Sequence, residues 1–360
     1  MKKFLKIFGV VWGIIVIIIV SCIFILWKRV ESIGIDNGGV ANYDRRINIW
    51  KTVAGNIPKN KLDDMNIDYK SNRLIATFKF TNAIVNKKYK DVEKTIDTFT
   101  YFYEIKGGFE KTTYEDEPYL IPYLAENSDT AVIVIPGGGF GYKSMDGGTE
   151  EGKEVAETLN KNGISAFILH YRTNPYEYPI PYLDLQRAIK YLKYNSEKYG
   201  LNKDKISVIG FSAGGNLIAH YINQIQNKDI YPNDYERDEI DNEDATLDVA
   251  SMIYPAITFN DNIPMLFALF DSEEVRDDQT RKELLNLMDN IKNFNSSNVK
   301  QFVAYGLEDD MVGVTETPKY IEKAKEQKTD IKEIIVKKGS HGFKQKFYMN
   351  DYIKWFKNNI

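Results

Sequence analysis

Apolar and polar positions follow a regular strand–helix order over the carboxy-terminal two-thirds of the chain. Short apolar runs predict strands, and the longer amphipathic stretches between them predict helices. The predicted strands are Ala131–Ile135, Ile164–His170, Ile206–Ile209, Leu247–Tyr254, Gln301–Tyr305 and Ile331–Val336, and the first helices between them are Thr149–Asn160 and Tyr182–Tyr199. Strands separated in this way require right-handed crossovers. The pattern therefore predicts an α/β fold with a mostly parallel sheet and helices on both faces.

The region before this alternation is less regular. Residues 32–43 are glycine-rich and largely polar, which predicts a linker. Asn48–Lys61 and Leu74–Phe80 predict a helix and a strand, and Thr98–Ile105 alternates as a half-buried strand does. We therefore expect residues 31–117 to form a linker and an amino-terminal extension.

The amino terminus carries a long apolar run. Ile7–Trp27 contains no charged residue, and basic residues flank it on both sides. A helix of this length crosses a hydrocarbon core of about 30 Å. Residues 1–30 therefore predict a single-pass membrane anchor, with the rest of the chain outside the cell. Ile19–Cys22 resembles a bacterial lipobox, which leaves a lipoprotein anchored at Cys22 as the alternative.

Composition narrows the function classes. The formal net charge is −4, with no concentrated basic stripe beyond the membrane flank, so nothing indicates a nucleic-acid partner. One cysteine excludes an intramolecular disulfide, and three histidines leave little from which to build a metal site. We expect neither a metal nor a cofactor. The charge run Asp229–Asp248 lacks the spacing of a calcium loop and predicts a solvated loop.

A nucleophile elbow lies near the middle of the chain. Gly210–Gly214 has the pattern G-x-S-x-G, between the predicted strand Ile206–Ile209 and a helix that opens at Gly215. Such a sharp strand-to-helix turn strains the central residue and lifts its hydroxyl above the sheet. Ser212 is therefore a candidate nucleophile.

A glycine-rich loop provides candidate oxyanion donors. Pro136–Tyr142 follows the buried strand Ala131–Ile135 and contains three consecutive glycines. Without Cβ atoms the backbone N–H groups of such a loop can approach a ligand closely. Together with the N–H of Ala213, they can hold the oxyanion of a tetrahedral intermediate.

The general base follows by elimination among three histidines. His220 lies eight residues after Ser212 on the same predicted helix. That spacing is about 12 Å along the axis, too far to take the hydroxyl proton. His170 closes a strand and precedes the serine in the chain, which breaks the triad order of serine, acid and histidine. His341, in Gly339–Phe343 after the last predicted strand, remains.

The acid comes from the loop after Gln301–Tyr305. Glu308, Asp309 and Asp310 are adjacent there, and each is a carboxylate that can orient the base. The order serine, acid, histidine is the one in which α/β-hydrolases present a triad.

From about Tyr119 to its end, the chain resembles the α/β-hydrolase superfamily, and within it the acetyl-esterase branch associated with xylanases and polysaccharide degradation. The segments that carry the resemblance are Pro136–Phe140, Glu154–Ala156 with Leu159, Leu169–Arg172, Pro179–Pro181, Asp184–Ala188, Gly210–Gly215, Gly306–Asp309 with Val312, and His341–Phe343. The resemblance implies an α/β-hydrolase catalytic domain over residues 118–360. Residues 255–298, with predicted helices Pro264–Phe270 and Arg281–Ile291, fit either a cap over the substrate pocket or a surface helix pair, and we favour the cap.

Carried over residue by residue, the resemblance implies Ser212 as nucleophile, Asp309 as acid and His341 as base. It also implies Gly138, Gly139 and Ala213 as oxyanion donors. Asp309 is favoured because it matches the family pattern G-x-x-D-x-x-V from Gly306 to Val312.

The resemblance implies a serine esterase that hydrolyses short-acyl esters, acetyl above all, through an acyl-enzyme. The apolar run Ile7–Trp27 adds the expectation that this esterase is membrane-anchored. Its substrate would be a small ester or an acetylated polysaccharide, with Tyr142 or Tyr176 stacking on a sugar ring. Pro136 replaces the histidine of the hormone-sensitive-lipase-like group, which argues against long acyl chains. The alternatives are a serine peptidase on the same fold and a catalytically silent cell-surface binding protein.

Overall fold

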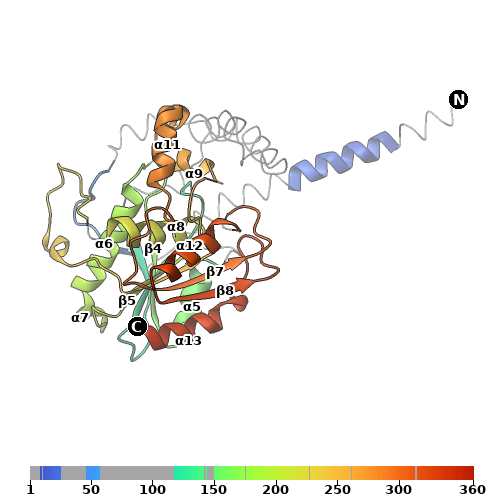
Figure 1. The fold of residues 1–360 in the computed structure, drawn as a ribbon. Helices are drawn as coiled ribbons and strands as arrows, with labels where there is room; N and C mark the ends of the chain where they lie inside the picture. Colours follow the sequence, from blue (N-terminus) through green and yellow to red (C-terminus); the bar gives the residue numbers. More distant parts are fainter. Residues whose placement is uncertain are drawn as a thin grey trace.

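In the computed structural model, a central sheet of eight strands organises the chain (Figure 1). The structure describes residues 9, 11–25, 46–56, 117–141, 143, 150–174, 176–226, 228–260, 262–312 and 314–360. The strand order among them is β1-β2-β4-β3-β5-β6-β7-β8.

Six neighbouring strands of this sheet are parallel, as the sequence pattern predicts. The strands are β1 (Ile47–Asn48), β2 (Tyr119–Tyr123), β3 (Ala131–Ile135), β4 (Ser165–His170), β5 (Ile206–Phe211), β6 (Val249–Ile253), β7 (Lys300–Gly306) and β8 (Ile331–Val336). β3 to β8 pair in parallel, whereas β1 and β2 join one edge in antiparallel orientation. The expected α/β-hydrolase fold is confirmed for the described part of the chain, and with two antiparallel strands at one edge the sheet is mostly parallel.

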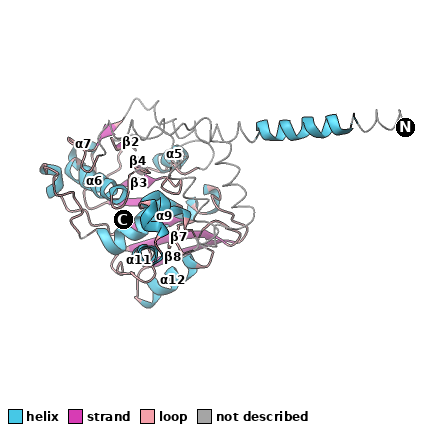
Figure 2. Cartoon of the chain, turned by 90° about the horizontal axis from the view of Figure 1, so that it is seen from above, coloured by secondary structure: helices cyan, strands magenta, loops and turns pink. Residues whose placement is uncertain are grey.

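Helices cover both faces of the sheet (Figure 2). They are α5 (Lys153–Lys161), α6 (Ile180–Tyr194), α7 (Ser196–Tyr199), α8 (Ala213–His220), α9 (Pro264–Leu269), α10 (Ser272–Arg276), α11 (Asp278–Leu287), α12 (Glu316–Glu326) and α13 (Met349–Asn359). Alternate residues of each strand point to opposite faces. In β3, Ile133 packs in a cluster with α6, α8 and α12, and Val134 packs in a second cluster with α5 and α13.

The predicted helix Asn48–Lys61 is wrong over its described part. Residues 48–56 begin in strand β1 and continue as a loop. Ile49 and Trp50 are buried in the main core, and the Arg187 Nε donates to the Ile49 carbonyl at 2.7 Å. A distant side chain thus satisfies a backbone group that a helix would have paired locally. The predicted linker at 32–43 and the strands at 74–80 and 98–105 lie outside the described residues.

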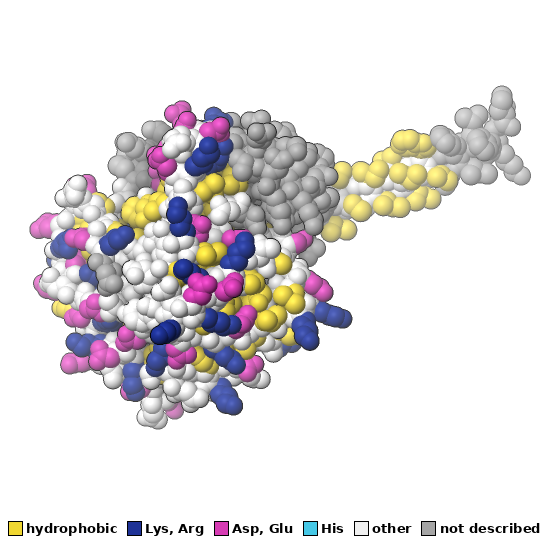
Figure 3. Space-filling model, in the orientation of Figure 1, with side chains coloured by type: hydrophobic (Ala, Val, Ile, Leu, Met, Phe, Trp, Pro, Cys, Tyr) yellow, Lys and Arg dark blue, Asp and Glu magenta, His cyan; other side chains and the backbone are white. Residues whose placement is uncertain are grey.

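The expected membrane-spanning helix over residues 7–27 is described only at residue 9 and residues 11–25, where the chain is helical. Its apolar side chains are exposed, as the yellow surface along this helix in Figure 3 shows. Within the described ranges, no helix combines the length and apolar character that crossing a membrane requires.

The segment after β6 packs onto the body of the domain. The described side chains of α9 are buried in the main core cluster, and the Tyr178 N–H donates to the Leu269 carbonyl at 2.7 Å. The Phe259 ring lies 6.4 Å from that of Phe140, in the glycine-rich loop. The segment therefore borders the loop after β3, and its role as a cap stays a prediction.

Candidate active site

The elbow between β5 and α8 holds Ser212 in a strained conformation. Its φ is 51° and its ψ is −114°, values that residues with a side chain rarely adopt. A Cβ at Gly210 would lie 2.3 Å from the Gly214 carbonyl oxygen, and one at Gly214 would lie 2.2 Å from that of Ile135. The two glycines therefore let the turn press against β3, and the surrounding packing maintains the strain.

Three predicted residues meet at the carboxyl end of the sheet. The Ser212 Oγ lies 2.9 Å from the His341 Nε2, and the His341 Nδ1 lies 2.9 Å from the Asp309 Oδ2. The His341 side chain is 18% exposed and the Asp309 side chain 2%. A serine, an imidazole and a buried carboxylate therefore form one continuous hydrogen-bonded chain that opens to solvent at its centre.

The loop after β7 selects Asp309 over its neighbours. Its other oxygen, Oδ1, accepts the backbone N–H groups of Met311 at 3.0 Å and Val312 at 2.9 Å, which closes a tight turn. Asp310 is exposed, as is Glu308. Asp309 is thus the carboxylate of this triplet that meets His341.

The glycine-rich loop turns sharply after β3. Gly138 has a φ of 126° and Gly139 a φ of 62°, which side chains disfavour. The Gly141 N–H donates to the Gly138 carbonyl at 3.1 Å and closes the turn. Ala213 begins α8, so its N–H lies at a helix N-terminus without an intrahelical acceptor. These are the expected oxyanion donors, and their role stays a prediction.

The other two histidines are buried in the body of the domain. His220 packs against the Tyr182 ring at 4.8 Å, and burial lowers its pKa to about 3. His170 stacks on the Tyr119 ring at 4.5 Å, and burial, with the positive charges of Lys143 and Arg46, lowers its pKa. Both imidazoles are therefore neutral side chains of the interior.

The predicted sugar-stacking role of Tyr176 is wrong. Its side chain is 1% exposed, with the Arg172 guanidinium 5.1 Å from the ring centroid. Its hydroxyl donates to the Asn56 Oδ1 at 3.2 Å. A ring enclosed in this way presents no face to a ligand. Tyr142, the other candidate, lies outside the described residues.

Two residues near the triad had no signal in the sequence. Glu151 is 4% exposed, and its Oε2 accepts the Gly137 N–H at 2.9 Å. Its Oε1 accepts the Tyr254 hydroxyl at 3.0 Å, and the Tyr254 ring lies edge-on to His341 at 5.2 Å. The sequence pattern placed Glu151 near the start of the predicted helix Thr149–Asn160 and Tyr254 at the end of the predicted strand Leu247–Tyr254. Only the fold brings them beside the triad.

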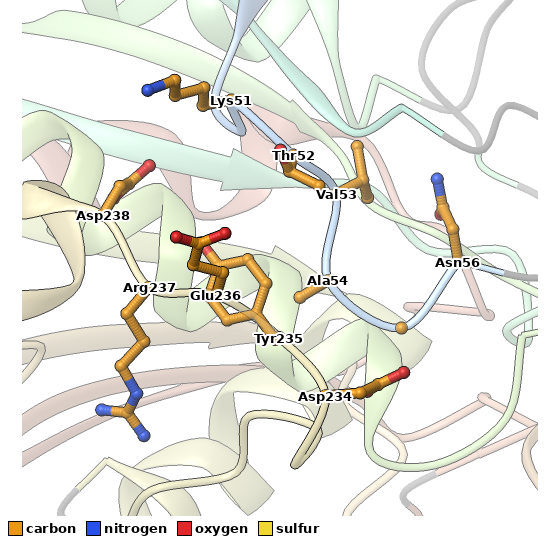
Figure 4. A pocket seen from close by; sticks show the side chains of 11 residues that line it. Lys51, Thr52, Val53, Ala54, Asn56, Asp234, Tyr235, Glu236, Arg237 and Asp238 are labelled. Carbon is orange, nitrogen blue, oxygen red and sulfur yellow. The ribbon is translucent and has the colours of Figure 1, made fainter.

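A separate polar pocket of about 500 Å³ lies between residues 51–56 and 234–238 (Figure 4). Its walls include Asn56, Glu236 and Arg237, and no triad residue lines it. Among the described residues, no group of three or more His, Cys, Asp or Glu side chains is arranged to hold a metal ion.

Two relatives each match about a third of the chain. It is 31% identical over 115 residues to an acetylxylan esterase of Xylanibacter ruminicola, covering 32% of this chain and 23% of that protein. It is 33% identical over 132 residues to endo-1,4-beta-xylanase B of Butyrivibrio fibrisolvens, covering 34% of this chain and 19% of that protein. The matches thus span less than a quarter of the length of these two curated relatives.

Solved structures share the fold. An acetyl ester-xyloside bifunctional hydrolase from Caldicellulosiruptor lactoaceticus superposes with a TM-score of 0.56 at 27% identity, covering 67% of this chain and 88% of that one. An esterase from Thermogutta terrifontis, 16% identical with a TM-score of 0.52 over 67% of this chain and 88% of its own, shows the fold alone. Residues 119–323 match the BD-FAE family. Because that match extends over more than half of the 360 residues, the chain belongs to the BD-FAE family, and its resemblance to the acetyl-esterase branch of α/β-hydrolases is confirmed.

Proposed function

We propose that this protein is a serine esterase that hydrolyses short-acyl esters, above all acetyl esters on polysaccharides, through an acyl-enzyme. The observation that carries the proposal is the chain of two 2.9 Å contacts from Ser212 through His341 to Asp309. With Nδ1–H donating to the Asp309 carboxylate, Nε2 is left to accept the Ser212 hydroxyl proton.

In the first half of the reaction, Nε2 of His341 takes that proton while Oγ of Ser212 attacks the ester carbonyl. The resulting oxyanion is held by backbone N–H groups of Gly138, Gly139 and Ala213. When the tetrahedral intermediate collapses, the ester C–O bond breaks and the alcohol leaves with the proton from His341. Asp309 holds the imidazole in the required tautomer and stabilises its positive charge.

In the second half, a water molecule attacks the acyl-serine while His341 accepts a proton from it. Collapse of this intermediate releases the carboxylic acid and returns the proton to Ser212 Oγ. No bond is oxidised or reduced, so the proposed cycle requires no cofactor.

The proposed substrate class rests on the relatives and on the glycine-rich loop. The names of the matched acetylxylan esterase and xylanase refer to xylan, and the solved bifunctional hydrolase is named for an acetyl ester and a xyloside. By the resemblance, Pro136 stands where the hormone-sensitive-lipase-like group carries a histidine. We therefore propose a small acyl pocket and a large sugar-bearing alcohol side.

A fluorophosphonate probe tests the nucleophile. We expect labelling at Ser212 in the full chain, and we expect Ser212→Ala to lose both labelling and turnover of p-nitrophenyl acetate. Turnover in the unlabelled variant at the wild-type rate would remove the proposed mechanism. A parallel panel of peptide substrates tests the peptidase alternative, which requires amide cleavage at Ser212.

A series of acyl chain lengths tests the pocket. A short pocket loses burial and gains steric cost with each added methylene, so kcat/KM should fall about tenfold or more for each added pair of carbons. We expect p-nitrophenyl acetate to be cleaved fastest and acetate to be released from acetylated xylo-oligosaccharides. A maximum at octanoate would contradict the acetyl-esterase assignment and leave the serine chemistry intact.

The location of the protein is a further part of the proposal. The exposed apolar side chains of residues 11–25 support a membrane anchor with the catalytic domain outside the cell. External protease on intact cells should then remove the catalytic domain and leave a short stub. Mass spectrometry that finds a diacylated Cys22 at the mature amino terminus would establish the lipoprotein alternative, and a cytosolic full-length chain would contradict both.

A further inference from the structure

Glu151 is a buried carboxyl with two neutral hydrogen-bond donors. The Gly137 N–H donates to its Oε2 at 2.9 Å and the Tyr254 hydroxyl donates to its Oε1 at 3.0 Å. The side chain lies just before α5, in the loop at the carboxyl end of the sheet. A buried carboxyl whose hydrogen bonds within the described part of the chain come from a peptide and a phenol is costly, so its position calls for a reason beyond stability.

On one side, the carboxyl holds the start of the glycine-rich loop. A Cβ built on Gly137 would lie 2.9 Å from the Ser212 Cβ and 3.0 Å from the Glu151 Oε2. The carboxyl, this peptide and the proposed nucleophile therefore converge. Because its N–H is engaged by Glu151, the Gly137 peptide has a fixed orientation, and the next N–H groups, of Gly138 and Gly139, follow from it.

On the other side, the carboxyl holds the ring that packs on the proposed base. Tyr254 has a φ of 38°, an uncommon value for an aromatic residue, and its N–H donates to the Ala304 carbonyl at 2.7 Å. Its ring centroid lies 5.2 Å from that of His341, edge-on. The bond from the hydroxyl to Glu151 fixes where this ring meets the imidazole.

The charge of Glu151 is linked to that of His341. Burial raises the pKa of the Glu151 carboxyl to about 7, although both hydrogen bonds and the positive charge of His341 act to lower it. Among the described residues, the phenols of Tyr171, Tyr254 and Tyr348 also interact with its charge. When ionised, the carboxylate attracts the positive charge that His341 carries after it takes the Ser212 proton.

We propose that Glu151 is a positioning residue that sets the oxyanion loop through Gly137 and the imidazole of His341 through Tyr254. It thereby couples the two halves of the site, which lie on separate loops. This inference rests on the proposed esterase function and adds a residue to it.

Variants at Glu151 in the full chain test the coupling, with kcat expressed per site labelled by fluorophosphonate. Glu151→Ala removes both bonds and should lower kcat for p-nitrophenyl acetate about 100-fold, the cost of misplacing reacting groups by about 1 Å. KM should change less than kcat, because the donors act mainly in the transition state. Glu151→Gln can accept from Gly137 and donate to Tyr254, so it should recover most of the lost kcat.

A tyrosine pair provides a matched control. Tyr254→Phe keeps the ring against His341 and removes only the bond to Glu151, so kcat should fall about tenfold. Tyr221→Phe removes an equally buried hydroxyl, which donates to the Ala245 carbonyl at 2.7 Å away from the triad. Its kcat per labelled site should match that of the wild type.

The outcomes separate this inference from the proposed function. Inactive Ser212→Ala, together with Glu151→Ala and Tyr254→Phe that turn over at the wild-type kcat, would overturn the positioning role and leave the esterase intact. Wild-type turnover in Ser212→Ala would instead overturn the esterase. If Glu151→Ala does not fold, the tyrosine pair decides, and equal kcat in Tyr254→Phe and Tyr221→Phe counts against the proposal. Loss without recovery in a folded Glu151→Gln also contradicts it.

Discussion

Two buried carboxyls of this molecule have opposite surroundings. Asp184, on α6, accepts three hydrogen bonds of 2.7 to 3.2 Å from the Arg172 guanidinium and a fourth, at 2.8 Å, from the Arg172 N–H. Among the described residues, Glu151 instead accepts hydrogen bonds from a peptide N–H and a phenol. The first carboxyl is neutralised by a fixed charge. The pKa of the second is raised by burial, so its charge depends on pH and interacts with the charge of His341.

The same contrast extends to the regions around them. Near the β1 edge, Arg187 pairs with Asp238 and Asp241 at 2.6 Å, and the Arg172 Nη1 donates to the Ala54 carbonyl at 2.7 Å. These charges hold residues 46–56 to the domain. The run Asp229–Asp248, predicted as a solvated loop, contributes Asp241 to this buried network, and that prediction is wrong at this position.

The loops around the triad, at the carboxyl end of the sheet, instead contain strained backbone. Six described residues other than glycine have a positive φ, and four of them lie in the loops around the triad: Phe140, Glu150, Ser212 and Tyr254. Each such conformation costs about 1–3 kcal/mol and persists only when packing imposes it. One region of the domain therefore uses its buried polar groups for stability, and the other holds them in positions suited to chemistry.

The largest expected effect is on activity, when the acid of the triad is changed. Asp309→Asn keeps an oxygen for the Met311 and Val312 N–H groups but presents an amide to His341, which favours the wrong tautomer. kcat should fall about 10⁴-fold, or about 5 kcal/mol of transition-state stabilisation, with little change in unfolding free energy. Asp310→Asn, the exposed neighbour, is the control. If Asp310→Asn is crippled while Asp309→Asn stays active, the acid is misassigned.

Near β1, where Arg172 and Arg187 form buried ion pairs, we expect a loss of stability with little loss of activity. Asp184→Asn leaves the fully buried Arg172 guanidinium without a counter-charge, which should cost about 3–5 kcal/mol of unfolding free energy. Urea denaturation measures this loss, and kcat per labelled site should stay close to wild type. A loss below about 1 kcal/mol, typical of a surface pair, would show that this region is not stabilised as described.

The pH dependence of stability tests the raised pKa of Glu151. The folded protein holds the Glu151 proton up to a pKa of about 7, whereas an ordinary glutamate loses it near 4.5. The carboxyl therefore stabilises the fold most below pH 4.5, and this contribution is lost as the pH rises towards 7 and above, by up to about 3 kcal/mol. Glu151→Gln cannot titrate, so its stability relative to wild type should increase from pH 5 to pH 8. A difference that is constant with pH would contradict the raised pKa.

The smallest effect is expected for an exposed ion pair. Lys205 and Asp129 meet at 2.8 Å, with side chains 37% and 53% exposed. Lys205→Gln should cost less than about 1 kcal/mol, and salt should reduce even that. Thermal unfolding at two ionic strengths measures it. A loss comparable to that of Asp184→Asn would remove burial as the reason for the contrast.

The local sequence pattern was sufficient to predict the parallel sheet and the turn that carries the nucleophile. Strand period and apolar runs predicted the six parallel strands, because the inner strands β3 to β6 are buried on both faces and are mostly apolar. The edge strand β8 is partly exposed and includes Lys332 and Glu333. The elbow at Ser212 and the order of the three triad segments were also legible, because a sharp turn restricts which residues can occupy it. These features depend on neighbours a few residues apart.

The contacts across long separations were decided only by the tertiary structure. Burial distinguishes Asp309 from Asp310, and it encloses Tyr176 between Arg172 and Asn56. The Arg187 Nε reaches the Ile49 carbonyl across 138 positions, so the local preference of residues 48–56 for a helix is overridden. Glu151 likewise acquires its raised pKa and its contacts near the triad only when the loops after β3, β6 and β8 converge. Sequence pattern determined which residues form the elements and the nucleophile's turn, whereas packing determined which polar groups are buried together, because burial depends on partners far apart in the chain.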